Sequence, residues 1–471
     1  MDPARTESSR VLLGATGLAA LASAPYLSGG PVWDDHTLIV QSLALLPLSE
    51  LGTLWTQPVG GAGPGAGYYR PVAMTALAVL GRLGIPAIHL LAAALHVGST
   101  ALLWRLLGGS AAVLLFAVHP MAGEVLGWAS ALPDALAVFF SLLAAVLLPR
   151  TVLGATLALL AGILSKETAL LPFVFLALGG LLPLRPALSA WGVAVVGAGA
   201  ARLLAGTGAD YAIWSHRHLI PAALAWPVAS AGVPWPLTAV RDLLAAPAWV
   251  TPLGVGLLGG MLWWGRRSRL ALAGAALLLA APALALPPTL DGYLAAERYL
   301  YPGLVGLAMW ATALKPPPRL LWLVGALALG SHLWRGPQWH SDRALFSAAT
   351  RAMPSSSYAW HFYGMVAAQE GDMATAADAF GAAVETGHPH PLDRLLRLRA
   401  LVESGQHEAA CAWAADGPDD GLTAEYIAWW ARAAWEAGRV DDARRLIGML
   451  QTPDGWDGPP WVGALAAAVQ G

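Results

Sequence analysis

Residues 11–36 read VLLGATGLAALASAPYLSGGPVWDDH, an apolar run long enough for a membrane helix followed by two adjacent carboxylates. A carboxylate is costly inside a bilayer, so an acid at the bilayer edge either faces water or has a task there. Arg5 and Arg10 precede the run and small residues end it, as in a secretory signal peptide. The many later apolar runs favour an uncleaved first helix instead. We therefore expect Asp34 and Asp35 to lie where this helix leaves the membrane.

The composition of the 471-residue chain is that of a membrane protein. Hydrophobic residues make up 57% and charged residues 12%, with a mean hydropathy of +0.57, whereas soluble domains carry about 25% charged residues. The character changes near residue 340, after which the chain is charged, Ala-rich and amphipathic. The sequence predicts an all-α protein with a polytopic membrane domain over 1–340 and a helical-repeat domain over 341–471.

Several classes of function are excluded by composition and motifs. A net charge of −2 and a pI near 6.6 provide no electrostatic footprint for nucleic acid. The only cysteine, Cys411, excludes an intrachain disulfide and a Cys-rich metal site. The chain contains no Gly-rich phosphate loop, HExxH motif or Gly-x-Ser-x-Gly elbow. We predict no nucleic-acid partner, no metal site and no tightly bound cofactor; whether a divalent metal is required is not decided by the sequence.

A membrane span needs about 20 predominantly apolar residues. The interrupted segment 218–237 contains four prolines and is expected to be re-entrant or interfacial. Eleven candidate spans lie near 11–29, 86–106, 109–127, 134–149, 151–165, 168–184, 189–205, 249–265, 269–287, 299–314 and 319–334.

Charged residues divide between the two sides of this topology. The basic side carries Arg5, Arg10, Arg105, Arg150, Arg185, Arg266, Arg267, Arg269, Lys315 and Arg319. The other side carries Asp34, Asp35, Glu50, Glu124, Asp134, Glu167, Asp210, Asp242, Asp291, Glu297 and Asp342. The positive-inside rule puts the basic side and the N-terminus in the cytoplasm. The odd number of spans then puts the C-terminal domain on the outer side.

Two further segments have distinctive patterns. The first outer loop, about 30–85, contains the Gly-rich run 60–67, which we expect to be a mobile hinge or lid. Beyond residue 340, glycines at 371, 405 and 438 are 34 and 33 residues apart, and alanines at 376, 410 and 443 repeat that spacing. This period predicts about three tetratricopeptide-type repeats. Residues 456–470 would form a capping helix.

Asp34 and Asp35 are the candidate catalytic base. Adjacent acids repel, so one is expected to have a raised pKa, and a base that deprotonates an acceptor hydroxyl must be exposed at the membrane boundary. The alternative is that one of the two caps the helix beginning near Thr37.

Three further motifs on the outer side have both a functional and a structural interpretation. His119 would contact a phosphate, oriented by Glu124 or Asp134, or would be a structural interface histidine. Lys166 would bind phosphate with Glu167 as its holder, or the two would form a structural ion pair.

The motif Glu297-Arg298-Tyr299-Leu300-Tyr301-Pro302 would grip a phosphate or sugar through an arginine and two aromatic rings. Tyr and Arg also belong to the ordinary interfacial belt. Arg70 is a further outer-side cation, most simply a solvated loop charge, and Arg202 lies within a span and needs a partner or a phosphate.

The order of these motifs resembles that of a known family. An acidic pair after the first span, Tyr69-Arg70-Pro71, residues 116–125 (FAVHPMAGEV), Ser165-Lys166-Glu167, residues 297–302 (ERYLYP) and trailing repeats follow one another. The chain thereby resembles the transmembrane and tetratricopeptide-repeat O-mannosyltransferases and their bacterial relatives, which have the GT-C glycosyltransferase fold. The Arg that usually stands two residues before Asp134 is Leu132 here.

The resemblance implies an enzyme of the bacterial inner membrane with periplasmic repeats. Its donor would be a polyprenyl-phosphate monosaccharide, and its acceptor a protein Ser or Thr hydroxyl, docked on the repeats. Transfer would be inverting, with Asp34 or Asp35 as base; we favour Asp35. The donor phosphate would be held by Lys166, Glu167, Arg298, Tyr299, Tyr301, His119 and Arg70, supported by Glu124, Asp134, Glu297 and Arg202. The alternative is a non-catalytic membrane-anchored scaffold whose repeats recruit envelope-assembly partners.

Overall fold

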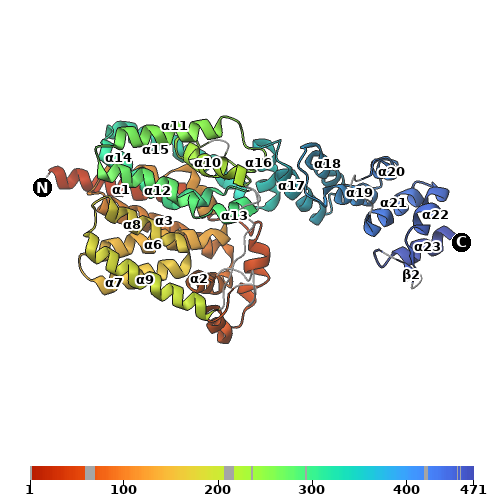
Figure 1. Cartoon of the computed structure of the whole chain (residues 1–471), viewed down its shortest axis with the longest axis horizontal. Helices are drawn as coiled ribbons and strands as arrows, with labels where there is room; N and C mark the ends of the chain where they lie inside the picture. The colour runs from red at the N-terminus through yellow and green to blue at the C-terminus, as the bar shows by residue number, and fades with distance from the viewer. Residues whose placement is uncertain are drawn as a thin grey trace. The chain divides into compact units, whose positions relative to one another are not determined.

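The computed structural model describes residues 3–58, 69–205, 217–234, 237–291, 294–417, 423–452, 455–456 and 458–470. Its contacts divide the chain into two compact units, residues 1–345 and 346–471, each described by itself below. The described residues are predominantly helical, which confirms the all-α prediction (Figure 1). The predicted lid at 60–67 and the acid Asp210 lie outside the described residues.

The first unit is built from helices of very different length. The longer ones are α1 (Pro3–Ser23), α2 (Pro71–Gly81), α3 (Ile85–Leu106), α6 (Leu132–Leu147), α7 (Val152–Ser165), α8 (Leu170–Leu178), α9 (Leu184–Leu204), α10 (Ile220–Gly232), α11 (Val250–Gly265), α12 (Arg269–Ala283), α14 (Tyr301–Leu314), α15 (Pro318–Arg335) and α16 (Asp342–Ala352). Short elements used below are η2 (Asp35–Val40), η4 (Leu48–Trp55), η5 (Ala111–Val113), α4 (Leu114–Ala117), η6 (Pro120–Ala122), α5 (Gly123–Gly127), η7 (Ala129–Ala131), η8 (Glu167–Ala169), α13 (Leu286–Asp291) and η10 (Glu297–Leu300).

The prediction of eleven full-length spans is wrong. Among the described residues, three helices are long and apolar enough to cross a membrane: Ile85–Leu106, Ala129–Leu147 and Leu184–Leu204. A fourth span would result only if Asp35–Leu45 and Leu48–Trp55, which meet at 119°, were counted as one. Because this pair turns back on itself, we do not count it as a span. Other apolar helices, such as α7 and α12, are shorter.

The run 109–127 shows why the count fails. It was expected to be one span, but it folds as η5, α4, η6 and α5 in succession. The hydroxyl of Ser110 caps η5 by accepting from the Ala112 N–H at 3.2 Å, and Pro120 lacks the N–H that a continuous helix needs. The segment 218–237, which we expect to be re-entrant or interfacial, contains the 13-residue helix α10 with Pro227 inside it.

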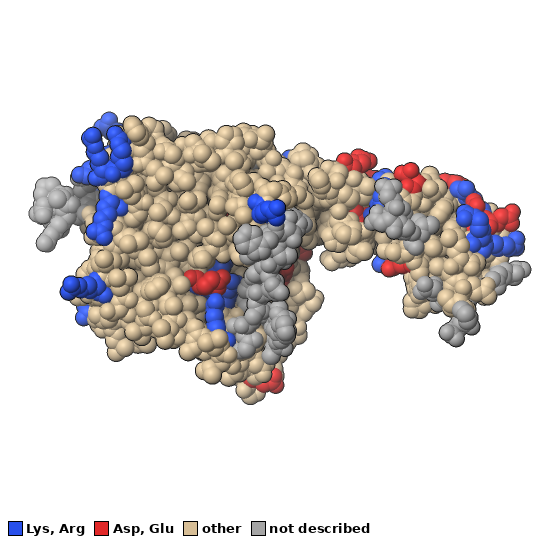
Figure 2. Space-filling model, viewed as in Figure 1, with Lys and Arg blue, Asp and Glu red and all other residues tan. Residues whose placement is uncertain are grey.

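Charge is unevenly distributed over the first unit. Figure 2 shows Lys and Arg side chains gathered at one end of it. Basic residues end several helices: Arg105 lies in the last turn of α3, Arg266 follows α11, and Lys315 follows α14. Charges of opposite sign lie together elsewhere on the face drawn in Figure 2.

Close packing of α12 against α14 depends on two glycines. A Cβ atom on Gly274 would lie 2.4 Å from the Gly306 carbonyl oxygen, and one on Gly306 would lie 2.4 Å from the Gly274 oxygen. The two backbones therefore approach more closely than any other residue type permits. Small residues at helix contacts are typical of membrane bundles, where dispersion forces rather than the hydrophobic effect hold helices together.

We predict that Gly274→Ala lowers the free energy of unfolding by about 1–3 kcal/mol, because the added methyl group forces α12 and α14 apart. The matched control is Gly256→Ala in α11, where nothing lies within 4 Å of the added Cβ. Thermal unfolding of both variants in detergent micelles measures the difference. Equal melting temperatures for the two variants would contradict the packing argument.

The second unit is a series of helix pairs followed by a short hairpin and a last helix. Its helices are α17 (Ser357–Gln369), α18 (Met373–Glu385), α19 (Asp393–Glu403), α20 (His407–Ala415), α21 (Ala424–Glu436), α22 (Val440–Gly448) and α23 (Val462–Gln470), and its antiparallel strands are β1 (Gln451–Thr452) and β2 (Gly455–Trp456). The predicted capping helix over 456–470 is thus shorter than expected, because Trp456 belongs to the hairpin.

Each pair turns at one of the periodic glycines. Gly371, Gly405 and Gly438 have φ of 82°, 76° and 77°, a region that favours glycine. In each turn the next residue's N–H reaches back five residues, as in the 2.8 Å bond from Asp372 to the Ala367 carbonyl. This is the glycine-terminated helix end that satisfies the last carbonyls. The helix pairs and their glycine turns fit the sequence period; membership of the tetratricopeptide class stays a prediction.

Candidate functional site

The turn after α1 is fixed by the carboxylate of Asp35. This side chain is completely buried. Its Oδ1 accepts from the Ser130 N–H at 2.8 Å and from the Ser130 hydroxyl at 2.6 Å, and its Oδ2 accepts from the Val32 N–H at 3.1 Å. A carboxylate with these internal donors ties the turn to η7, the start of a long apolar helix. The contacts of Asp35 are therefore those of a residue that fixes the turn, and it is not exposed as a base would be. This differs from our preference for Asp35 from the sequence.

A second carboxylate, from a residue 306 positions after His36 in the chain, also holds this turn. Asp342 accepts from the Trp33 N–H at 2.7 Å and pairs with His36 Nε2 at 2.8 Å. Trp33 has a φ of 54°, unusual for a residue with a large side chain. Because residues on both sides of Asp34 are held in place, Asp34 itself has a defined backbone position.

Asp34 is the exposed member of the pair. It stands at the start of η2, but its side chain makes no capping hydrogen bond, so the helix-cap alternative is not observed. Partial burial raises its pKa above the ordinary value, and the positive charge of Arg298 opposes that shift. Asp34 is thus a carboxylate that retains access to solvent and feels the positive charge of Arg298.

Aromatic rings connect the turn to Arg298. The Trp33 ring stacks on Trp128 with centroids 5.6 Å apart, and the Arg298 guanidinium lies 4.5 Å from the Trp128 centroid. Arg298 also lies 4.8 Å from the Tyr299 ring centroid. Stacking on two rings fixes the plane of the guanidinium.

Each of these predicted cations is held by a carboxylate from a distant segment. Arg298 pairs with Glu124 through its guanidinium and through its backbone N–H, the latter at 3.1 Å. Lys166 Nζ donates to both carboxylate oxygens of Asp134 at 2.7 Å. Arg70 and Arg298 lie near enough for their charges to act on Lys166. These cations form one group.

Glu167 does not hold Lys166, contrary to the prediction. Its carboxylate instead bridges Arg70 at 2.9 Å and Arg202 at 3.1 Å. Arg70 is only 13% exposed in its side chain and is thus not a solvated loop charge. Adjacent residues on a chain that leaves a helix point in different directions, which is why Lys166 pairs with a residue 32 positions away.

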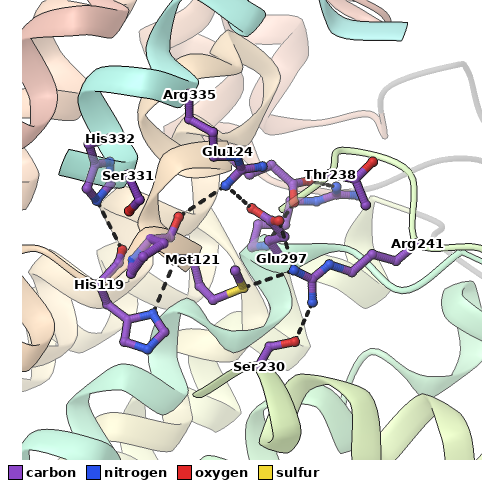
Figure 3. Close-up of polar contacts among 12 residues, drawn as sticks. His119, Met121, Glu124, Ser230, Thr238, Arg241, Glu297, Ser331, His332 and Arg335 are labelled. Carbon is purple, nitrogen blue, oxygen red and sulfur yellow. Dashed lines mark hydrogen bonds and ion pairs between the residues drawn. The ribbon is translucent and has the colours of Figure 1, made fainter. Parts of the chain in front are cut away.

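A buried network lies directly behind Arg298. Glu297 accepts from Arg241 at 3.0 Å and from Arg335 at 2.6 Å, and all three side chains are at most 2% exposed (Figure 3). Two arginines around one carboxylate hold the backbone from which Arg298 projects. Burial of these charges is tolerable only because they are paired.

Two predicted donor-binding residues are buried and make contacts of a structural kind. His119 is buried; its Nε2 pairs with the Ala231 carbonyl at 3.1 Å, and its Nδ1 accepts from the Met121 N–H at 3.3 Å (Figure 3). Neither Glu124 nor Asp134 orients it, and it has the structural role. Tyr301 is likewise buried, and its hydroxyl pairs with His96 Nδ1 at 2.9 Å.

The sequence analysis missed five residues that shape the site: Ser130, Trp128, Arg241, Arg335 and Asp342. Trp128 and Ser130 follow the FAVHPMAGEV motif closely, which was the only available signal. A comparison of the chain with protein-family models, with curated proteins and with solved structures finds no match. The site must therefore be interpreted from its own geometry.

Burial of Asp35 predicts a specific dependence of stability on pH. Burial raises its pKa from 3.8 to about 6, although hydrogen bonds from Ser130 and Val32 oppose the shift. The folded protein therefore binds this proton more tightly than the unfolded chain. Between about pH 4 and pH 6 the free energy of unfolding should fall as pH rises, by up to about 3 kcal/mol from this group.

The Asp35→Asn variant should lack this contribution, so the wild-type protein should lose stability relative to it as the pH rises from 4 to 7. Thermal unfolding in detergent micelles across that range measures the difference. Glu50→Gln in η4, where the acid is exposed, is the matched control and should follow the wild type. A constant difference between wild type and Asp35→Asn would contradict the prediction.

Proposed function

We propose that the chain is an integral-membrane glycosyltransferase that moves a monosaccharide from a polyprenyl phosphate to a hydroxyl acceptor, with Asp34 as general base. The observation that carries the proposal is an exposed carboxylate, Asp34, that feels the positive charge of Arg298, which belongs to the group of cations that also contains Lys166 and Arg70. An acceptor hydroxyl needs a base, and a departing phosphate needs positive charge. The charge of Arg298 acts on Asp34, which supports placing the two functions in one site.

The environment of Asp34 suits a base. A pKa above the ordinary carboxylate value makes it a better proton acceptor for a hydroxyl. In an inverting transfer the acceptor attacks the sugar on the side opposite the phosphate. Asp34 would take the proton of a Ser or Thr hydroxyl as the new glycosidic bond forms. Asp35 would act through the turn, by fixing the position of Asp34.

The cations have donors left for a phosphate. A guanidinium carries five N–H groups in a planar fork, so Arg298 can keep Glu124 and still face a phosphate oxygen. Lys166 carries three N–H donors, of which Asp134 accepts two. As the bond to the sugar breaks, negative charge grows on the phosphate, and these donors would stabilise it.

Sidedness is a further part of the proposal. The basic residues at the ends of α3, α11 and α14 would face the cytoplasm, and the site and the second unit would lie on the outer side. A lipid-linked donor fits a site beside apolar helices, because its chain can remain in the bilayer. The second unit would dock a protein or peptide acceptor, as helical-repeat arrays do.

The Asp34→Asn variant should lose at least about 100-fold in transfer activity, since it removes the base without removing the side chain's volume. Mass spectrometry of envelope glycoproteins, in cells lacking the chain and complemented with each variant, is the measurement. Glu50→Gln should restore wild-type glycosylation. Undiminished glycosylation with Asp34→Asn would refute the assignment of the base.

The same measurement of envelope glycosylation distinguishes the enzyme from the non-catalytic scaffold. A non-catalytic membrane anchor predicts that glycosylation is identical with and without the chain, and that only deletion of 346–471 has a phenotype.

The proposed topology predicts the activity of fused reporters. An enzyme that folds only outside the cytoplasm should be active when fused after Gly471 and inactive when fused to a chain truncated after Arg267, because the basic loop stays inside. A reporter that requires the cytoplasm should give the opposite result at both positions. Reversal of the pattern would overturn the sidedness while leaving the base assignment to its own test.

A further inference from the structure

The second unit contains a cluster of metal-ligating side chains that the proposed transfer reaction does not use. His361 lies in α17, His390 in the connection between α18 and α19, and Asp393 at the first position of α19. One potential ligand atom from each residue lies within 4.8 Å of the others, and no other such group of three occurs among the described residues.

The contacts within the cluster define how a cation would fit. His361 Nδ1 and Asp393 Oδ1 are 2.6 Å apart, and the rings of His361 and His390 have centroids 4.4 Å apart. In a tetrahedral zinc site with bonds of about 2.0–2.2 Å, ligand atoms are about 3.3 Å apart. The ligand atoms of the cluster are 2.6 Å apart for His361 and Asp393 and all lie within 4.8 Å of one another, a range that includes this value.

The surroundings hold the ligands in place. Asp393 is completely buried, and its Oδ2 accepts from the His390 N–H at 2.8 Å. The Nδ1 of His390 accepts from the Leu392 N–H at 3.3 Å, so its Nε2 is the nitrogen suited to a metal. The ring of His361 packs edge-on against Phe362 and Phe380, which form an apolar wall. Such outer contacts orient ligands and limit access of water.

We propose that His361, His390 and Asp393 bind a divalent transition-metal ion, with zinc as the best fit. Two imidazoles and one carboxylate match the ligand preferences of zinc, and water would complete the coordination. The cation would take the place of the hydrogen between His361 Nδ1 and Asp393 Oδ1, and the neutral ring of His361 would then carry its proton on Nε2. Because the ligands come from α17, from the 386–392 connection and from α19, the ion would fasten this connection to two helices.

The test uses the full-length protein in detergent, treated with a chelator and then titrated with Zn²⁺ against a competing indicator dye. We expect one tight site per chain, weakened about 10- to 100-fold in His390→Ala. His388→Ala is the matched control, since His388 is an exposed histidine two positions away in the same connection. It should bind as the wild type does.

Substitution with Co²⁺ gives a second readout that does not depend on affinity. A tetrahedral site with nitrogen ligands should produce intense visible absorption in the wild type and in His388→Ala, and this absorption should be lost in His390→Ala and His361→Gln. Zn²⁺ should also raise the unfolding temperature of the wild type but not of His390→Ala. Equal zinc affinity in wild type and His390→Ala, or equal loss in His388→Ala, would overturn the proposal and leave a hydrogen-bonded His361–Asp393 pair only.

Discussion

The double ion pair of Glu297 with Arg241 and Arg335 is the interaction on which the rest of the first unit's polar structure depends. An uncompensated charge in so apolar a unit would be prohibitively costly, so each buried charge must find a partner. Glu297 satisfies two arginines at once and anchors the short helix η10 (Glu297–Leu300). Its neighbour Arg298 is thereby presented to Glu124 and to the rings of Trp128 and Tyr299. Removal of Glu297 would leave Arg241 and Arg335 buried without this carboxylate and would loosen the segment that carries Arg298.

The two adjacent aspartates differ in their surroundings, because Asp35 is buried and Asp34 is exposed. Successive side chains on an irregular segment point in different directions, so one can be buried while the other faces solvent. Three internal hydrogen bonds occupy the carboxylate of Asp35, and an equally hydrogen-bonded Asp34 could not accept a proton from a substrate. The arrangement reverses our preference for Asp35. If Asp34 is the base that we propose, Asp35 preorganises the site by fixing the backbone beside it.

The helical class followed from composition, because an apolar chain with few charges must satisfy its backbone within helices. The number of spans could not be predicted in the same way, because mean hydropathy over a window does not register a break in a helix. Ser110 and Pro120 divide the run 109–127 into short helices, although its hydropathy is continuous. The site was predictable only in its residue types. Lys166 and Glu167 are neighbours in sequence and were paired for that reason, yet Asp134 holds Lys166. Partners that lie 32 to 174 positions apart are set by how helices pack, which no local pattern contains.

The charge balance of the outer site bears on what it can bind. Four cations (Arg70, Arg202, Lys166 and Arg298) are paired with three carboxylates (Glu167, Asp134 and Glu124), so one positive charge is left over, and an ionised Asp34 would bring the sum to zero. A structural cluster needs no more than this balance, and nothing in it requires an exposed acid. The side chain of Asp34 is exposed, and among the described residues it makes no hydrogen bond to these cations. Partial burial raises its pKa. A ligand that brings a phosphate to the cations and a hydroxyl to Asp34 would use both features; a membrane anchor would use neither.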